Sequence, residues 1–172
     1  MEQVILVDQD DQEIGVCEKL DAHRRGRLHR AFSVFILNEQ EALLVQQRAE
    51  TKYHTGGLWT NTCDGHPRPG ETVREAARRR LLEEMGFECE LKDAFVFTYY
   101  ARLGDDLVEH EYDHVLIGRF DGEPTPDPRE AADYRWIDLE TLVQDMREQP
   151  DRYAPWFKIA QEKLLPYLGK AS

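Results

Sequence analysis

The sequence predicts an α+β or α/β fold in which a mixed β-sheet is flanked by helices. Short segments rich in β-branched and aromatic residues alternate along the chain with segments of helical pattern. The clearest helix lies mid-chain with strands on both sides of it, an interleaving typical of these two classes. A length of 172 residues without repeats or linkers suits one core, so we expect a single domain over residues 1–172.

The strands expected before that helix are short. Val4–Val7 is apolar and precedes turn-forming aspartates. Ala31–Leu37 and Ala42–Gln47, joined by polar residues, are expected to form a β-hairpin. Leu58–Cys63 is a further extended segment. These segments supply the first part of the sheet.

The helix carries start and stop signals. Thr72 with Glu75 three residues later fits a capping box, and Gly86 stands where a C-terminal glycine is common. Its expected buried stripe consists of Val73, Ala76, Ala77, Leu81 and Leu82.

Two longer strands and two helices are expected after it. Phe95–Ala101 and Leu107–Phe120 have strand composition and are joined by a turn at Gly104-Asp105-Asp106. Gly122–Pro128 is a proline-rich loop. The remaining expected elements are a strand at Tyr134–Ile137, a helix at Leu139–Glu148, and a helix at Trp156–Leu168 that is interrupted by Pro166.

Composition excludes several classes of protein. A formal charge of −12 argues against a nucleic-acid binder, whose surface is net basic. Three cysteines without a CxxC pair argue against a disulfide framework or a cysteine-rich zinc site. No apolar run reaches the roughly 18–20 residues of a membrane span, and the acidic start lacks the pattern of a signal peptide. We therefore expect a cytoplasmic protein, whose acidic surface reflects either a high-salt cytoplasm or ordinary solubility.

Three of the six histidines occupy distinctive positions. His23 and His29 flank an arginine-rich loop, His29 begins a strand, and His66 follows a tight Asp-Gly turn. Imidazole together with carboxylate suits divalent transition ions such as zinc or manganese. A single histidine is more often a surface or core residue, and spacing alone leaves the convergence of these three open.

Glu109 and Glu111 lie two residues apart on an expected strand. Side chains alternate along a strand, so these carboxylates face one side and His110 the other, with the two acids roughly 7 Å apart. They could bind one cation or belong to a solvated acidic face, and the spacing favours neither.

Within residues 70–87, Arg79, Glu83, Glu84 and Gly86 match the REUxEExGU part of the Nudix box. In that motif, helical acids after a glycine-led loop bridge Mg²⁺ to a diphosphate. Two glutamates of the motif are replaced in this sequence. Ala76 stands at the position of the earlier glutamate, and Arg80 stands at the position of the glutamate that follows the motif's arginine. An arginine is better suited to binding a phosphate group than to binding a metal cation. Alone, the segment would be a surface helix with Arg–Glu pairs.

Three features in order make the resemblance specific: WTNTCDGHP at residues 59–67, the degenerate Nudix helix, and the Glu109-His110-Glu111 strand. From about Val4 to Trp156 the chain resembles type 1 isopentenyl-diphosphate isomerase, a Nudix-fold family. The resemblance implies a Nudix-like fold and interconversion of isopentenyl and dimethylallyl diphosphates, in which protonation and deprotonation move a double bond.

Carried over by position, the resemblance also implies ligands and roles. It implies one divalent ion, Mn²⁺, Zn²⁺ or Mg²⁺, bound by His23, His29, His66, Glu109 and Glu111. It implies a Mg²⁺ held by Glu84 and the substrate, with the diphosphate gripped by Lys19, Arg48, Lys52 and Arg80. Tyr99 and Trp156 would stabilise a carbocation with their π faces, or else simply pack in the core.

Asp64 departs from the family, which has an acid–base cysteine at this position. Cys63 is its neighbour and should face the opposite way along an extended segment. Asp64 could take over the cysteine's role, because burial can raise an aspartate pKa by several units. Alternatively, the pocket performs other chemistry, such as hydrolysis, or is catalytically silent. We favour Asp64 and Glu111 as the acid–base pair, with donor and acceptor interchangeable.

The expected partner is a small prenyl diphosphate, without nucleic acid or membrane, bound by a monomer or weak dimer. A Nudix-type hydrolase of a prenyl or nucleotide diphosphate is the first alternative, but Ala76 and Arg80 replace acids that such hydrolysis uses. A non-catalytic prenyl-diphosphate-binding relative is the second, and it predicts binding without turnover.

Overall fold

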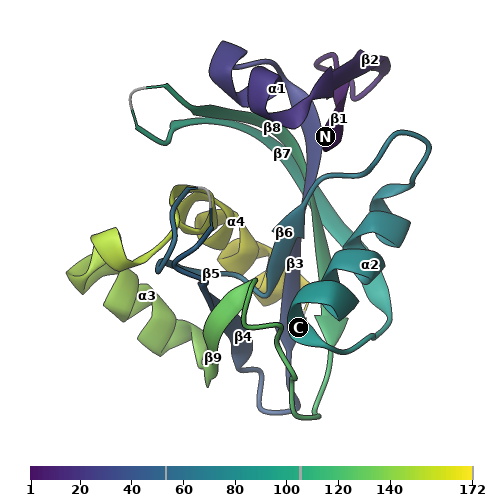
Figure 1. The fold of residues 1–172 in the computed structure, drawn as a ribbon. Helices are drawn as coiled ribbons and strands as arrows, with labels where there is room; N and C mark the ends of the chain where they lie inside the picture. The colour runs from purple at the N-terminus through teal and green to yellow at the C-terminus, as the bar shows by residue number, and fades with distance from the viewer. Residues whose placement is uncertain (53, 105, 172) are drawn as a thin grey trace.

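The computed structural model describes residues 1–52, 54–104 and 106–171. Its strands join in one mixed sheet with helices packed around it, which confirms the predicted fold class (Figure 1). The strands are β1 Gln3–Val7, β2 Glu13–Glu18, β3 His29–Leu37, β4 Leu43–Arg48, β5 Trp59–Thr60, β6 Cys63–Gly65, β7 Leu91–Arg102, β8 Val108–Arg119 and β9 Ala131–Ile137. The helices are α1 Lys19–Arg25, α2 Val73–Met85, α3 Leu139–Glu148 and α4 Pro155–Ala171, with a 3₁₀ turn at Pro150–Arg152.

The sheet divides into two halves at β3 and β4. On one side β3 pairs in parallel with β8, and β8 pairs antiparallel with β7. On the other side β4 pairs antiparallel with β9 and β5. β3 and β4 pair with each other only at Leu37 and Leu43, and then diverge. The expected hairpin thus has its turn but lacks a continuous ladder.

The segment between β5 and β6 crosses the gap that this divergence opens. Trp59 of β5 pairs with β4, and Cys63 of β6 pairs with β3. The expected single strand at Leu58–Cys63 is therefore wrong: the chain bends between two short strands. The Asp-Gly turn expected before His66 is also wrong, because Asp64 and Gly65 lie in β6.

At the crossing, Thr62 forms hydrogen bonds with both β3 and β4 in place of the ladder that these strands lack. Its buried hydroxyl accepts a hydrogen bond from Ile36 N at 3.0 Å and donates one to Leu44 O at 2.6 Å. The neighbouring Asn61 Nδ2 donates to Val34 O at 3.2 Å. Buried backbone groups must be paired, and β3 and β4 do not pair with each other here. The side chains of Thr62 and Asn61 therefore supply hydrogen-bond partners for the backbone of these two strands.

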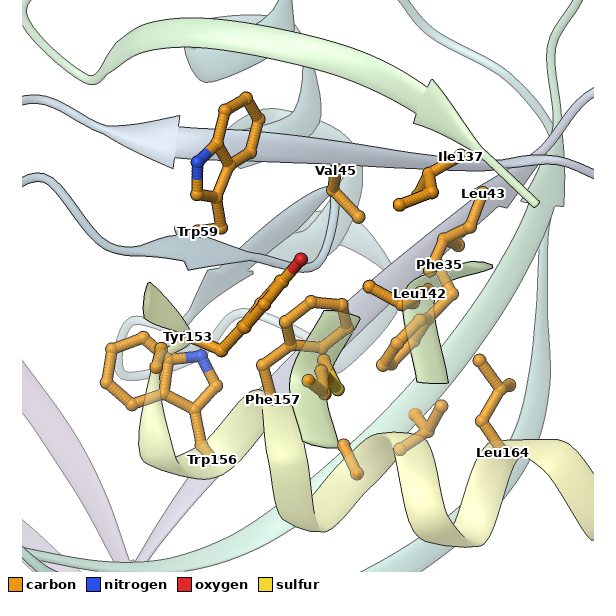
Figure 2. Packing of buried hydrophobic residues seen from close by; sticks show 14 of the residues in the cluster. Phe35, Leu43, Val45, Trp59, Ile137, Leu142, Tyr153, Trp156, Phe157 and Leu164 are labelled. Carbon is orange, nitrogen blue, oxygen red and sulfur yellow. The ribbon is translucent and has the colours of Figure 1, made fainter. Parts of the chain in front are cut away.

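β3 lies at the centre of the core and is buried on both faces. Phe35 and Leu37 belong to the cluster beneath α3 and α4. Figure 2 shows Phe35 in this cluster with Tyr153 and Phe157. Alternate residues of β3 face a second cluster beneath α2. This two-sided burial explains why the strand is an almost continuous apolar run.

Helix α2 begins and ends as predicted. Thr72 Oγ1 accepts from Glu75 N, and Glu75 accepts from Thr72 N. Gly86 has φ of 74°, and a Cβ there would lie 2.3 Å from Thr125 O, so glycine is required on both counts. Leu82 is wrong as a stripe residue, since it is 48% exposed, and the buried Met85 takes its place.

Other boundaries also differ from expectation. β2 and the short helix α1 were not expected, and His23 lies on α1 rather than beside a loop. α4 continues through Pro166, so the predicted interruption is wrong. Packing of Leu164 and Leu168 against the first cluster holds the helix on both sides of the proline. Asp105, in the turn expected before β8, falls outside the described residues.

None of the helices in the described ranges is both long and apolar enough to cross a bilayer.

Replacing Thr62 by valine removes the bridging hydroxyl at nearly constant shape. We expect it to leave Ile36 N and Leu44 O unpaired and to lower the free energy of unfolding by about 1–3 kcal/mol. Urea denaturation measures the effect, with Thr98→Val as control, because Thr98 is exposed on β7. Equal stability of the two variants would show that the crossing does not depend on this hydroxyl.

Candidate functional site

A cavity of about 480 Å³ opens where the two halves of the sheet diverge. Every site residue predicted from the sequence lines it except His23 and His29, which lie fully buried. The lining includes residues of α1, β3, β4, β6, α2, β7, β8 and the start of α4, elements far apart in the sequence. The predicted convergence at one cavity therefore holds for the lining residues.

Three histidines and one glutamate gather at the edge of this cavity. Ring centroids of His23, His29 and His66 lie 4.9–5.7 Å apart. His66 Nε2 lies 2.9 Å from Glu111 Oε1 and 3.3 Å from His29 Nε2. All four residues can offer ligand atoms within 4.8 Å of one another, which is the arrangement of a metal-binding site.

Glu109 does not join that group directly. It forms a second donor set with His23 and His54, again with ligand atoms within 4.8 Å of one another. His54 could not be identified from the sequence, because it stands in a stretch that fits no motif and a loop brings it to the site.

The hydrogen bonds of the histidine rings fit a cation. His23 Nδ1 donates to Lys19 O at 2.7 Å, and His29 Nδ1 donates to Arg27 O at 2.8 Å. These bonds fix the tautomer that leaves Nε2 as a lone-pair donor, as in known metal sites. His23 Nε2 is buried and has no hydrogen-bond partner among the described residues, as expected of an atom meant for a metal.

Glu109 and Glu111 face the same side of β8, as predicted, and meet the hydroxyl of Tyr99. Tyr99 Oη lies 2.7 Å from a carboxylate oxygen of each. Burial and the charge of Glu111 raise the pKa of Glu109. Burial acts on Glu111 too, but hydrogen bonds from His29 and His66 hold the pKa of Glu111 well below its usual value. The tyrosine thus bridges two carboxyls whose pKa values are shifted in opposite directions.

Asp64 faces the cavity from β6. Its Oδ1 accepts from Asn61 Nδ2 at 2.8 Å, and its Oδ2 accepts from Trp156 Nε1 at 3.0 Å. Burial raises the pKa of Asp64 to about 6. Cys63 instead belongs to the fully buried cluster beneath α2, consistent with the opposite orientation expected for neighbouring strand residues.

Of the predicted diphosphate-binding cations, Lys19, Lys52 and Arg80 are paired with carboxylates. Lys19 Nζ lies 3.0 Å from Glu2, and Lys52 pairs with Glu130. Arg48 lies over the ring of Trp156, with 5.2 Å between its guanidinium carbon and the ring centroid. These basic groups face the cavity and are held by contacts that an anionic ligand could replace.

Arg80 and Glu84 form the part of the site contributed by α2. Arg80 forms ion pairs with Glu83, Glu84 and Glu130. Although burial opposes it, the charges of Glu84 and Glu130 raise the pKa of Arg80. Glu84 is buried and accepts from Gln46 Nε2 at 2.7 Å. The carboxylate is thus fixed at the cavity wall.

Comparison with known proteins agrees with this architecture. Residues 27–157 match the model of the NUDIX domain. The chain is 53% identical to the isopentenyl-diphosphate Delta-isomerase of Burkholderia multivorans over 170 residues, 98% of this chain and 97% of that protein. It is 49% identical to the isopentenyl-diphosphate Delta-isomerase of Halorhodospira halophila over 161 residues, 92% of each chain.

Solved structures share the fold at lower identity. A protein from Deinococcus radiodurans superposes with a TM-score of 0.73 at 24% identity, covering 86% of this chain and 90% of that one. A MutT protein from Methanosarcina mazei gives 0.65 at 20% identity, covering 79% and 91%. With the isomerase relatives matched over nearly their whole length, the chain belongs to the isopentenyl-diphosphate Delta-isomerase family of the Nudix superfamily.

Proposed function

We propose that this protein isomerises isopentenyl diphosphate to dimethylallyl diphosphate, the activity named for its relatives. One observation carries the proposal beyond family membership. A single cavity is lined by a carboxyl on β6, a histidine–glutamate cluster on β8 and its neighbours, and a set of basic groups. An isomerase of this kind needs an acid, a base and an anion site in one enclosure.

The reaction needs two proton transfers, at the two carbons that flank the tertiary carbon of the alkene. Protonation of the terminal methylene carbon gives a tertiary carbocation, and loss of a proton from the carbon next to it, on the diphosphate side, gives the internal double bond. We assign the first transfer to Glu111, which receives its proton through the Tyr99 hydroxyl that also contacts Glu109, and the second transfer to Asp64. Glu109, whose pKa is raised, supplies that proton. Trp156 holds Asp64 in place, and the aromatic rings of Trp156 and Tyr99 line the cavity where positive charge develops.

Two divalent ions complete the proposed site. His23, His29, His66, Glu109 and Glu111 would hold one ion, which supplies positive charge beside the carboxylates and keeps Glu111 oriented. The nitrogen-rich donor set favours Mn²⁺ or Zn²⁺ over Mg²⁺. Glu84 would hold Mg²⁺ together with diphosphate oxygens, the hard ligands that Mg²⁺ prefers.

The basic groups would hold the diphosphate. Lys19, Lys52 and Arg80 each exchange a carboxylate partner for phosphate oxygens when the substrate binds. Arg48 approaches from the end of β4, beside Trp156. Anchoring the charged end in this way fixes the position of the alkene relative to Asp64 and Glu111.

Isopentenyl diphosphate in deuterated buffer tests the activity. With Mg²⁺ and Mn²⁺ present, we expect conversion to dimethylallyl diphosphate with deuterium in the product, followed by NMR. Phosphate release without deuterium uptake would indicate a hydrolase instead. Binding without either reaction would indicate a non-catalytic relative.

Asp64→Asn removes the proposed base while keeping its shape. We expect the isomerisation rate to fall by at least about 10²-fold, the usual contribution of one acid–base group. If Asp64 is the base, the variant still exchanges deuterium into the terminal methylene through Glu111, whereas the reverse assignment predicts loss of that exchange.

Two further variants serve as controls for Asp64→Asn. Asp64→Cys should retain or raise activity, since the family uses cysteine at this position. Asp133→Asn, an exposed change on β9, should leave the rate unchanged. Full activity of Asp64→Asn would rule out an acid–base role for this residue.

Lys52→Gln removes one of the proposed diphosphate contacts. A charge-assisted contact contributes about 1.5–3 kcal/mol, so we expect KM for isopentenyl diphosphate to rise about tenfold or more, with a smaller change in kcat. Steady-state kinetics measure both constants, and Lys92→Gln, at an exposed position away from the cavity, is the matched control. An unchanged KM would remove Lys52 from the diphosphate site.

A further inference from the structure

His54 reaches the metal-binding cluster from the loop between β4 and β5. Its Nε2 lies 3.9 Å from Glu109 Oε1, and its ring centroid lies 6.3 Å from that of His23. The other side of the cluster is formed by His29 and His66. His54 therefore approaches the cluster on the side of Glu109, away from His29 and His66.

The His54 ring is oriented in the same way as those of His23 and His29. His54 Nδ1 lies 3.1 Å from Thr55 Oγ1, and it is Nε2 that faces Glu109. In all three residues a local oxygen contacts Nδ1 and Nε2 is turned to the cluster, the outer hydrogen-bond pattern of metal-ligating histidines. His114 differs, because its Nε2 contacts Asp11, away from the site.

The loop backbone is built to hold His54 in this position. Thr55 has φ of 53°, a left-handed conformation that is costly for a β-branched residue. Its hydroxyl donates to His54 O at 2.7 Å, and an Arg48 guanidinium nitrogen donates to the same oxygen at 3.3 Å. A Cβ on Gly56 would lie 2.6 Å from Glu50 O, so the loop closes too tightly for a larger residue. Strain of this kind is typical of segments that position a functional group.

We propose that His54 is a sixth protein ligand of the cation held by His23, His29, His66, Glu109 and Glu111. The inference rests on the metal site of the proposed function and deepens it. His23 belongs to both donor sets and so links His54 and Glu109 to the group of His29, His66 and Glu111. The result is one ion with four imidazoles and two carboxylates.

A complete shell has consequences for the ion and for the substrate site. Six protein donors leave no open position, unlike catalytic metal sites that bind water or substrate directly. The ion then acts by holding Glu109 and Glu111 rather than by contacting the alkene. Four imidazoles favour a transition ion over Mg²⁺. The loop that bears His54 also bears Lys52 and begins after Arg48. Binding of the ion by His54 would therefore connect the metal site to the proposed diphosphate site.

Cobalt binding tests the proposal without relying on turnover. The metal-free wild type, His54→Ala and His114→Ala are titrated with Co²⁺, and both affinity and the visible spectrum are recorded. The wild type and His114→Ala should bind one ion with the weak absorption of six-coordinate cobalt. His54→Ala should bind at least about tenfold more weakly and show the stronger absorption of lower coordination. Added imidazole should restore the six-coordinate spectrum.

The outcomes separate this proposal from the proposed function. Identical affinity and spectrum in the wild type and His54→Ala would overturn the role of His54 while leaving the five-ligand site intact. Two ions in the wild type, one of them lost in His54→Ala, would replace the single shell by two sites. Failure of the wild type to bind any divalent ion would overturn both the sixth ligand and the metal site beneath it.

Discussion

The separation of β3 from β4 is the constraint on which the rest of the site depends. Two central strands that diverge leave buried N–H and C=O groups without a ladder, a cost that side chains must offset. Thr62 and Asn61 supply the missing hydrogen bonds from the crossing segment. The same crossing brings Asp64 and His66 to the cavity directly after it. The hydrogen bonds that replace the ladder and two groups of the candidate site thus come from six consecutive residues, 61–66.

Arg80 shows how one helix can serve different chemistry on a shared fold. Hydrolytic use of the Nudix helix relies on acids that hold metal, whereas here a guanidinium stands among Glu83, Glu84 and Glu130. This guanidinium pairs with Glu84 and lines the cavity, which supports the proposed role of Arg80 in binding the diphosphate. The fold neighbours share the scaffold at 24% identity or less, so the fold alone does not identify a reaction.

Features encoded locally could be predicted from the sequence. The cap at Thr72, the terminal Gly86 and the common face of Glu109 and Glu111 follow from spacing alone. The convergence of His23, His29 and His66 could be stated only through family resemblance, because it depends on the parallel pairing of β3 with β8 and on the crossing. His54 and the continuation of α4 through Pro166 depend on loop strain and tertiary packing, which have no sequence period.

Several buried carboxyl groups lie close together in and beside this cavity, and their ionisation requires positive charge nearby. Glu109, Glu111 and Asp113 follow one another along one face of β8, and Asp64 adds its charge from β6. Burial and the charge of Glu111 raise the pKa of Asp113, which accepts from Ser33 Oγ at 2.7 Å. Carboxyls this close cannot all ionise in a medium of low dielectric unless positive charge is added. A divalent ion bound at the proposed site would therefore orient these carboxylates. It would also stabilise the folded chain, since a ligand that binds only the native state adds its binding free energy to stability.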